Sequence, residues 1–74
     1  MVTLHADEEM YNDGLTAVDV ENAILSGRIE ERQRTGITGQ WKYRVRGPGC
    51  SGDTIEVILK LGPLGAIIVT VHVL

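Results

Sequence analysis

The strongest pattern of hydrophobic and polar positions lies near the end of the chain. Residues 54–61 and 66–73 are rich in Ile, Val and Leu, which favour strands. The four residues between them contain two Gly and one Pro, which is typical of a tight turn. This pattern predicts a β-hairpin. One face is expected to be apolar, with Ile55, Val57, Leu59, Leu61, Ile67, Val69, Val71 and Val73, and the other half polar, with Glu56, Ile58, Lys60, Ile68, Thr70 and His72.

Apolar and basic side chains alternate over residues 41–47, which is typical of a half-buried strand. One side carries Trp41, Tyr43 and Val45, and the other carries Lys42, Arg44 and Arg46. Residues 28–34 contain almost no apolar side chain, so a strand there is expected at the edge of the sheet. Residues 35–39 are predicted to form a loop.

Two short helices are predicted before these strands. The first spans about residues 4–13 and ends at Gly14. Its early turns contain Asp7, Glu8 and Glu9, and acidic groups suit the positive end of the helix dipole. Its inner side is expected to contain Leu4, Ala6, Met10 and Tyr11.

The second helix is expected over residues 16–26. Thr16 is a good cap, and Asp19 is placed as the partner in a shortened capping box. Leu15 and Val20 have the spacing of a hydrophobic staple. The inner stripe is expected to contain Ala17, Val20, Ala23, Ile24 and Leu25.

These elements predict a single α+β domain over residues 1–74, with two N-terminal helices packed on one face of a three- to four-stranded antiparallel meander. The helices are expected to cover Trp41, Tyr43, Val45 and the apolar face of the hairpin. The opposite face would present Lys42, Arg44, Arg46, Lys60, Thr70 and His72. A bulge in any strand would reverse the grouping of that strand.

Charge is divided unevenly along the chain. Residues 1–27 contain no Lys or Arg and carry −6, whereas residues 28–74 carry +3, for a net charge of −3. A basic sheet could face an anion, or both regions could be ordinary solvated surfaces. The chain has a single cysteine and no Cys/His spacing typical of zinc, so neither an internal disulfide nor a metal site is expected. It lacks a signal peptide and a membrane-length apolar run, so a cytoplasmic protein with no membrane partner is expected.

A series of short motifs runs through nearly the whole chain. They are His5-Ala6, Met10, Gly14-Leu15-Thr16, Gly27, Tyr43 and Thr70-Val71-His72. Their order and spacing resemble the small bacterial domain-of-unknown-function 4258 family. The resemblance implies a fold similar to the RelE-like ribonuclease toxins. It also implies a role in a toxin–antitoxin pair, beside a zinc-finger antitoxin.

The chain departs from the family pattern at two positions. Asp13 stands where the family usually has Arg, and His72 stands where it usually has Tyr. If that Arg binds phosphate, this chain has altered or lost activity.

RNA cleavage without metal or cofactor requires a base, an acid and cations that stabilise the charged phosphorane. His5 and His72 are the candidates for acid–base catalysis, because histidine titrates near neutral pH. The candidate phosphate-binding cations are Lys42, Arg44, Arg46 and Lys60.

Each of these residues also has a purely structural interpretation. His5 would orient the first helix, His72 would face solvent, and the strand cations would form a solvated face. Trp41 and Tyr43 are expected to pack in the core. Three hypotheses follow: an endoribonuclease-like toxin domain, a non-catalytic module that binds RNA or a protein, and a structural or immunity-type protein whose acidic helices contact a basic partner.

Overall fold

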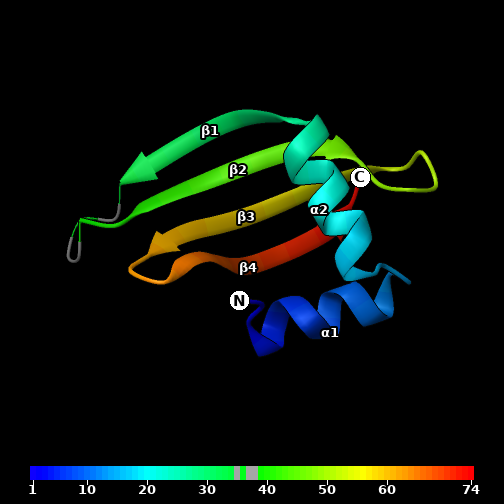
Figure 1. Ribbon diagram of the computed structural model, residues 1–74, viewed down its shortest axis with the longest axis horizontal. Coiled ribbons are helices and arrows are strands. Elements are labelled where there is room, and N and C mark those ends of the chain that lie inside the picture. Colours follow the sequence, from blue (N-terminus) through cyan, green and yellow to red (C-terminus); the bar gives the residue numbers. More distant parts are fainter. Residues whose placement is uncertain (35, 37–38) are drawn as a thin grey trace.

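The computed structural model describes residues 1–34, 36 and 39–74. Within these residues the chain forms two helices followed by a four-stranded antiparallel sheet of order β1-β2-β3-β4, which confirms the predicted α+β fold (Figure 1). The elements are α1 (Leu4–Asn12), α2 (Ala17–Ser26), β1 (Arg28–Arg34), β2 (Trp41–Pro48), β3 (Thr54–Gly62) and β4 (Gly65–Val73). The predicted loop at residues 35–39 lies largely outside the described residues. No described helix has the length and apolar character needed to cross a membrane.

Both helices begin at side-chain caps. The Oγ1 atom of Thr3 accepts a hydrogen bond from the backbone N–H of Ala6 at 3.2 Å and starts α1. Thr16 and Asp19 form the predicted capping box of α2, in which each side chain accepts a bond from the other residue's backbone N–H, at 3.3 and 2.8 Å. Gly14 follows α1 with φ of +69°, a conformation that glycine adopts without strain.

One buried apolar cluster joins both helices to the three strands β2, β3 and β4. Its members are Ala6, Met10, Val20, Ala23, Val45, Ile55, Val57, Leu59, Ile68 and Val71. α2 packs across β2 and β3, and Gly27 and Gly47 allow a close approach there. A Cβ atom at either glycine would overlap the carbonyl oxygen of Ala23. The helix therefore sits directly on the sheet backbone at this point.

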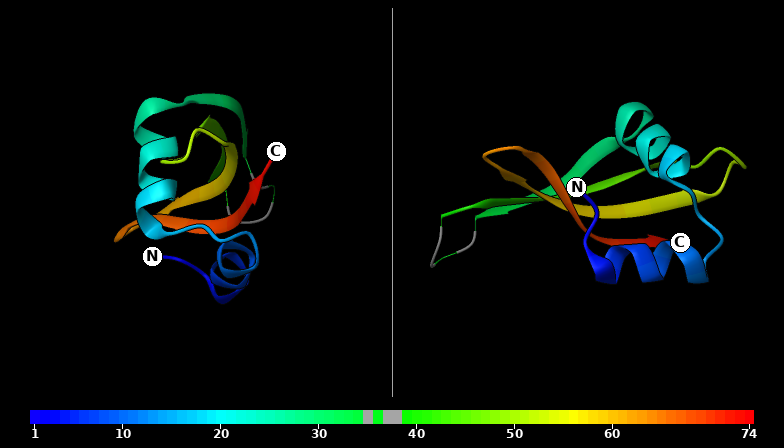
Figure 2. Two further views of the ribbon diagram at one scale, coloured as in Figure 1. Left: turned by 90° about the vertical axis from the view of Figure 1, so that its right-hand side faces the viewer. Right: turned by 60° about the horizontal axis from the view of Figure 1, so that its bottom comes forward.

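α1 lies along the outer edge of β4, as Figure 2 shows. The backbone N–H of Val71 donates to the Glu9 carboxylate at 3.1 Å, and that of Val73 donates to Asp13 at 3.4 Å. The residues before α1 also cover the edge of β4, because the backbone N–H of Ile68 donates to the carbonyl of Met1 at 2.8 Å. One edge of the sheet is thus protected by carboxylates and backbone, whereas every residue of β1 at the other edge is exposed.

The predicted faces of the last strand are correct only for its second half. The register between β3 and β4 shifts after Ile58, which pairs with Thr70, so that Leu59 pairs with Ile68. Ile68 is therefore buried, although the alternation placed it on the half-polar face. Ile67 lies opposite Lys60 on that face instead, and Val69 occupies the shift. An extra residue in one strand reverses the side-chain alternation beyond it.

Several predicted core residues are exposed. They are Leu4, Tyr11, Ala17 and Leu25 in the helices and Trp41 and Leu61 in the strands. In α1, Ala6 and Met10 fill the contact with β4, which leaves Leu4 and Tyr11 on the outer side. Trp41 and Leu61 lie at the ends of β2 and β3 that α2 does not reach (Figure 1). The helices are too short to cover the whole sheet.

Candidate functional site

One face of the sheet carries no helix, because α2 packs only on the other side (Figure 2). Cross-strand pairing arranges the polar side chains of this helix-free face in three rows. The rows contain Arg28, Arg46, Glu56 and His72, then Glu31, Arg44, Ile58 and Thr70, then Gln33, Lys42, Lys60 and Ile67. The structure thus places five of the six predicted site residues on one surface, and His5 is the exception.

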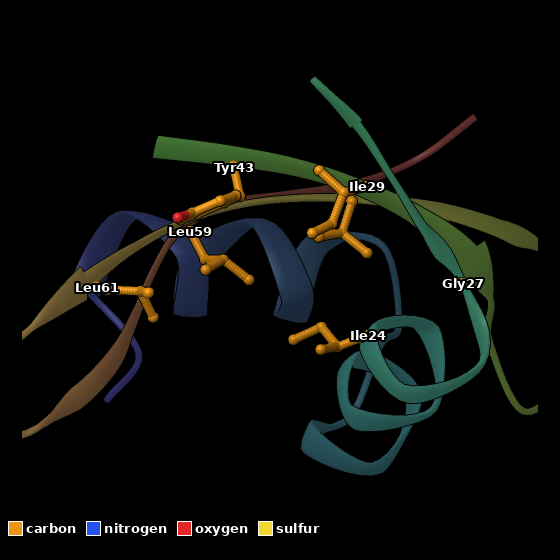
Figure 3. A pocket seen from close by; sticks show the side chains of 7 residues that line it. Ile24, Gly27, Ile29, Tyr43, Leu59 and Leu61 are labelled. Atoms are coloured by element: carbon orange, nitrogen blue, oxygen red, sulfur yellow. The ribbon is translucent and has the colours of Figure 1, made fainter. Parts of the chain in front are cut away.

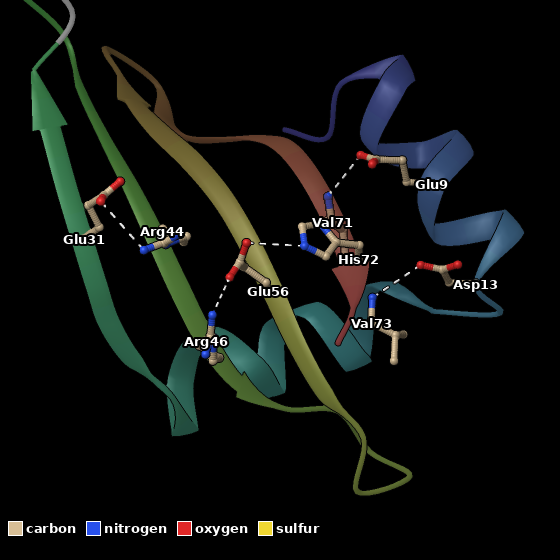
Figure 4. A network of polar contacts seen from close by, with 9 residues as sticks. All are labelled: Glu9, Asp13, Glu31, Arg44, Arg46, Glu56, Val71, His72 and Val73. Atoms are coloured by element: carbon tan, nitrogen blue, oxygen red, sulfur yellow. Dashed lines mark hydrogen bonds and ion pairs between the residues drawn. The ribbon is translucent and has the colours of Figure 1, made fainter.

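Glu56 is the centre of the first row (Figure 4). Its side chain is only 9% exposed, and its two carboxylate oxygens face two different partners. Oε2 lies 3.0 Å from Nη2 of Arg46, and Oε1 lies 3.3 Å from Nε2 of His72. A buried carboxylate requires such partners, because desolvating a charge is costly. The result is an Arg–Glu–His row that crosses three strands.

Arg44 in the second row is only partly compensated. Its Nη2 atom lies 3.7 Å from Oε2 of Glu31, and its buried Nε has no hydrogen-bond partner among the described residues. A small hollow of about 200 Å³ lies beside it, between β1, β2 and β3. Its lining includes Glu31, Gln33, Lys42, Arg44, Glu56 and Ile58. Tyr43 also contributes to the lining, so the hollow is mixed in polarity.

The third row places two like charges opposite each other. Lys42 of β2 pairs directly with Lys60 of β3. Neither ammonium group belongs to any of the ion pairs formed among the described residues. Directly opposed like charges destabilise a sheet. Repulsion between these lysines therefore opposes the pairing of β2 and β3 at this position.

The two histidines contact different carboxylates. The Nε2 atom of His5 lies 3.3 Å from Glu9, one turn further along α1, and the imidazole is largely exposed. Glu9 in turn accepts the backbone N–H of Val71 at the edge of β4. His72 turns toward Glu56 and the middle of the sheet (Figure 4). No contact among the described residues joins the two imidazoles.

Comparison with known proteins identifies a family. The family model described as "Domain of unknown function (DUF4258)" matches residues 2–73. The chain belongs to the DUF4258 family. No curated protein and no solved structure matches it. The resemblance to RelE-like toxins therefore stays a prediction.

Glu56 is the residue of this DUF4258 domain that sequence reasoning missed. The alternation placed it on the half-polar face, but nothing in the local sequence indicates that it is buried. The available signal was its isolation, because it is the only carboxylate in residues 54–73. A single acidic residue in a largely apolar strand, opposite a strand that carries three cations, favours an ion-pair role.

Asp13 caps the C-terminal end of α1. Its carboxylate accepts the N–H of Val73, next to His72 in the chain. The position at which the resemblance predicts Arg therefore lies at the same end of β4 as His72. In this chain a carboxylate occupies that place and covers the strand edge.

Trp41 and Cys50 are two further residues that could take part in binding or chemistry. The prediction that Trp41 packs in the core is wrong, because the residue is 39% exposed. The centroid of its ring lies 5.3 Å from the Arg32 guanidinium and 5.8 Å from that of Arg34. Desolvation, together with the Asp19 carboxylate, raises the pKa of the Cys50 thiol above 9.0, which disfavours the reactive thiolate. The described residues contain no His/Cys/Asp/Glu group that would hold a metal ion.

Proposed function

We propose that this domain binds RNA through its phosphates on the helix-free face of the sheet. The observation that carries the proposal is the Lys42–Lys60 pair, two directly opposed cations without a carboxylate partner among the described residues. A phosphate between them would replace like-charge repulsion by two favourable contacts. Arg44 and Arg46 add charge to the same face, although Glu31 and Glu56 partly neutralise them.

The geometry favours a ligand that extends along the strands. Lys42 and Arg46 on β2 are four positions apart, as are Glu56 and Lys60 on β3, which corresponds to about 13 Å along each strand. One strand of RNA that follows β2 and β3 would meet the lysine row and the Arg46–Glu56–His72 row in turn. A compact anion such as free phosphate would occupy only one of them.

Phosphate contact, and not base recognition, is expected to dominate. The aromatic residues of β2, Trp41 and Tyr43, belong to the opposite face. The helix-free face therefore offers neither of these rings to a base, and its His72 imidazole already contacts Glu56. Because phosphate contacts carry no sequence information, we expect a weak preference among RNA sequences.

RNA cleavage is a second candidate, favoured by the contact between His72 and Glu56. A carboxylate beside Nε2 favours the proton on that nitrogen and leaves Nδ1 as the basic nitrogen. In this scheme His72 takes the proton of the 2′-hydroxyl, the 2′-oxygen bonds to phosphorus, and the bond to the 5′-oxygen breaks. The imidazolium then returns the proton to the 5′-oxygen, while Arg46 stabilises the phosphorane.

In this scheme His72 serves as both base and acid. His5 takes no part, because it pairs with Glu9 and no hydrogen bond or ion pair among the described residues joins it to His72. It accords with the toxin role that the RelE-like resemblance implies, in which a zinc-finger antitoxin would be the protein partner. A non-catalytic RNA-binding or protein-binding module on the same fold is the alternative. The departure at Asp13 favours that alternative.

Binding is tested by the salt dependence of affinity for a labelled single-stranded RNA of mixed sequence, measured by fluorescence anisotropy. Each neutralised phosphate contributes about −0.7 to the slope of log affinity against log salt. Lys42→Ala/Lys60→Ala removes the site for one phosphate and should therefore make the slope shallower by about 0.7. The matched control Arg32→Ala/Arg34→Ala removes the same charge from the other face and should leave the slope unchanged. Equal effects of both double variants, or no binding at low salt, would overturn the proposal.

Cleavage is tested separately with end-labelled RNA in excess EDTA. If His72 is the acid–base group, His72→Ala should lower the rate by about 10²–10⁴. Glu56→Gln should lower it less, because it removes only the charge that orients the ring. His5→Ala should have no effect. Absence of cleavage by the parent would discard the second candidate and leave phosphate binding to stand on its own test.

A further inference from the structure

An apolar groove lies on the helix-bearing side of the sheet, beyond the end of α2 (Figure 3). Its volume is about 380 Å³. The lining includes Ile24, Gly27, Ile29, Tyr43, Leu59 and Leu61. Ile29 and Leu61 are more than half exposed, at 60% and 51%. The groove exists because α2 covers only part of this face while α1 lies at the edge of β4.

Two cations border this groove. Arg32 and Arg34 pair across the strands with Tyr43 and Trp41, so they belong to the same face as the groove. Their guanidinium groups lie near the Trp41 ring, and Arg34 also donates to the carbonyl of Gly39 at 3.2 Å. No carboxylate of the described chain forms an ion pair with either arginine. The groove is therefore apolar at its floor and positive at its border.

The outer side of α1 has the complementary character. Leu4, Asp7, Glu8 and Tyr11 share one helical stripe, opposite the buried Ala6 and Met10. Leu4 and Tyr11 are 75% and 86% exposed although both are apolar in character. Residues 1–27 contain no Lys or Arg, so no cation of this region competes for the two carboxylates. The same chain thus carries an acidic, partly apolar stripe and a basic, apolar groove.

We infer that the outer stripe of α1 docks in the groove of a second copy of this chain. Leu4 and Tyr11 would pack against Ile29 and Leu61, and the carboxylates of the stripe would pair with the two arginines that border the groove. In a dimer with twofold symmetry each copy offers its helix and receives the other, so both contacts form together. This inference is independent of RNA binding, because the groove and the lysine pair lie on opposite faces of the sheet.

The test is sedimentation velocity of the full chain over a range from low micromolar to submillimolar concentration. The parent should pass from monomer to dimer, and added salt should weaken the association. The emission of Trp41, the only tryptophan, should shift to shorter wavelength as the groove is covered. If the parent stays monomeric at every concentration, the inference is wrong, and the groove would be a site for a different protein.

Charge-reversal variants identify the two surfaces that form the dimer contact. Arg32→Glu/Arg34→Glu and Asp7→Arg/Glu8→Arg should each weaken self-association by at least about tenfold, because like charges then face each other. An equimolar mixture of the two variants should form a one-to-one complex. The matched control Lys42→Glu/Lys60→Glu, with the same charge change on the other face, should dimerise like the parent. A dimer that survives both reversals would instead involve pairing of the open β1 edges and would overturn the inference.

Discussion

His72 lies 3.3 Å from a carboxylate oxygen of Glu56, and the other oxygen of that carboxylate lies 3.0 Å from Arg46. The contact joins the last strand to the middle of the sheet at the one buried acidic residue of β3. It makes Glu56 both a structural and a positioning residue. The effects of Glu56 on unfolding free energy and on RNA cleavage can therefore be measured separately with variants of Glu56 and His72.

Replacing Glu56 with Ala should lower the free energy of unfolding by about 1–2 kcal/mol, because Arg46 and His72 lose their acceptor but both still reach water. Urea denaturation measures this loss. Glu31→Ala is the matched control, since Glu31 is exposed and 3.7 Å from Arg44, and it should cost less than about 0.5 kcal/mol. Equal losses would show that burial of Glu56 has no energetic consequence.

Val71→Asp should unfold the domain, because Val71 is fully buried and an unpaired buried charge costs several kcal/mol against a total stability of roughly 5 kcal/mol. Val69→Asp should be milder. The alternation alone placed both residues in the core, but Val69 lies at the register shift and is only half-buried. Far-ultraviolet circular dichroism and thermal melting distinguish the two. If Val69→Asp is the more damaging, the register shift is misplaced.

Gly47→Ala should lower the free energy of unfolding by about 1–3 kcal/mol, because the added methyl group would overlap the carbonyl of Ala23 and force α2 away from β2. Gly36→Ala is the control, since no atom of the described residues lies within 4 Å of a Cβ there, and it should change stability by less than about 0.5 kcal/mol. Chemical denaturation of both variants measures the difference. Similar stability would mean that helix and strand do not approach so closely.

Asp19 should make stability depend on acid pH. The backbone N–H groups of Thr16 and Cys50 donate to its carboxylate and lower its pKa below the ordinary 3.8. The stabilisation is therefore complete above pH 3.8 and is lost as the pH falls through the lowered pKa. Asp19→Asn should be less stable than the parent at neutral pH, with the gap narrowing in acid. A gap that stays constant with pH would contradict this assignment.

Local chemistry was sufficient to predict the elements and their order. Thr16 and Asp19 cap α2 whatever the helix packs against, because a capping box involves residues only three apart. The alternation of Trp41, Tyr43 and Val45 with Lys42, Arg44 and Arg46 likewise predicted β2 and the faces of its side chains. The sequence could therefore place the strand cations on one surface before any packing was known.

Tertiary packing decided which of these residues are covered and which groups meet. Glu56 is buried because Arg46 and His72 reach it from the two neighbouring strands. The register that brings these three residues together cannot be predicted from the sequence of any single strand. Leu4 and Tyr11 are exposed because the opposite side of α1 covers the edge of β4. The exposure of these residues therefore depends on how much of the sheet the two short helices can cover. Caps and alternation arise within a few residues, whereas burial and cross-strand partners arise between segments far apart in the chain.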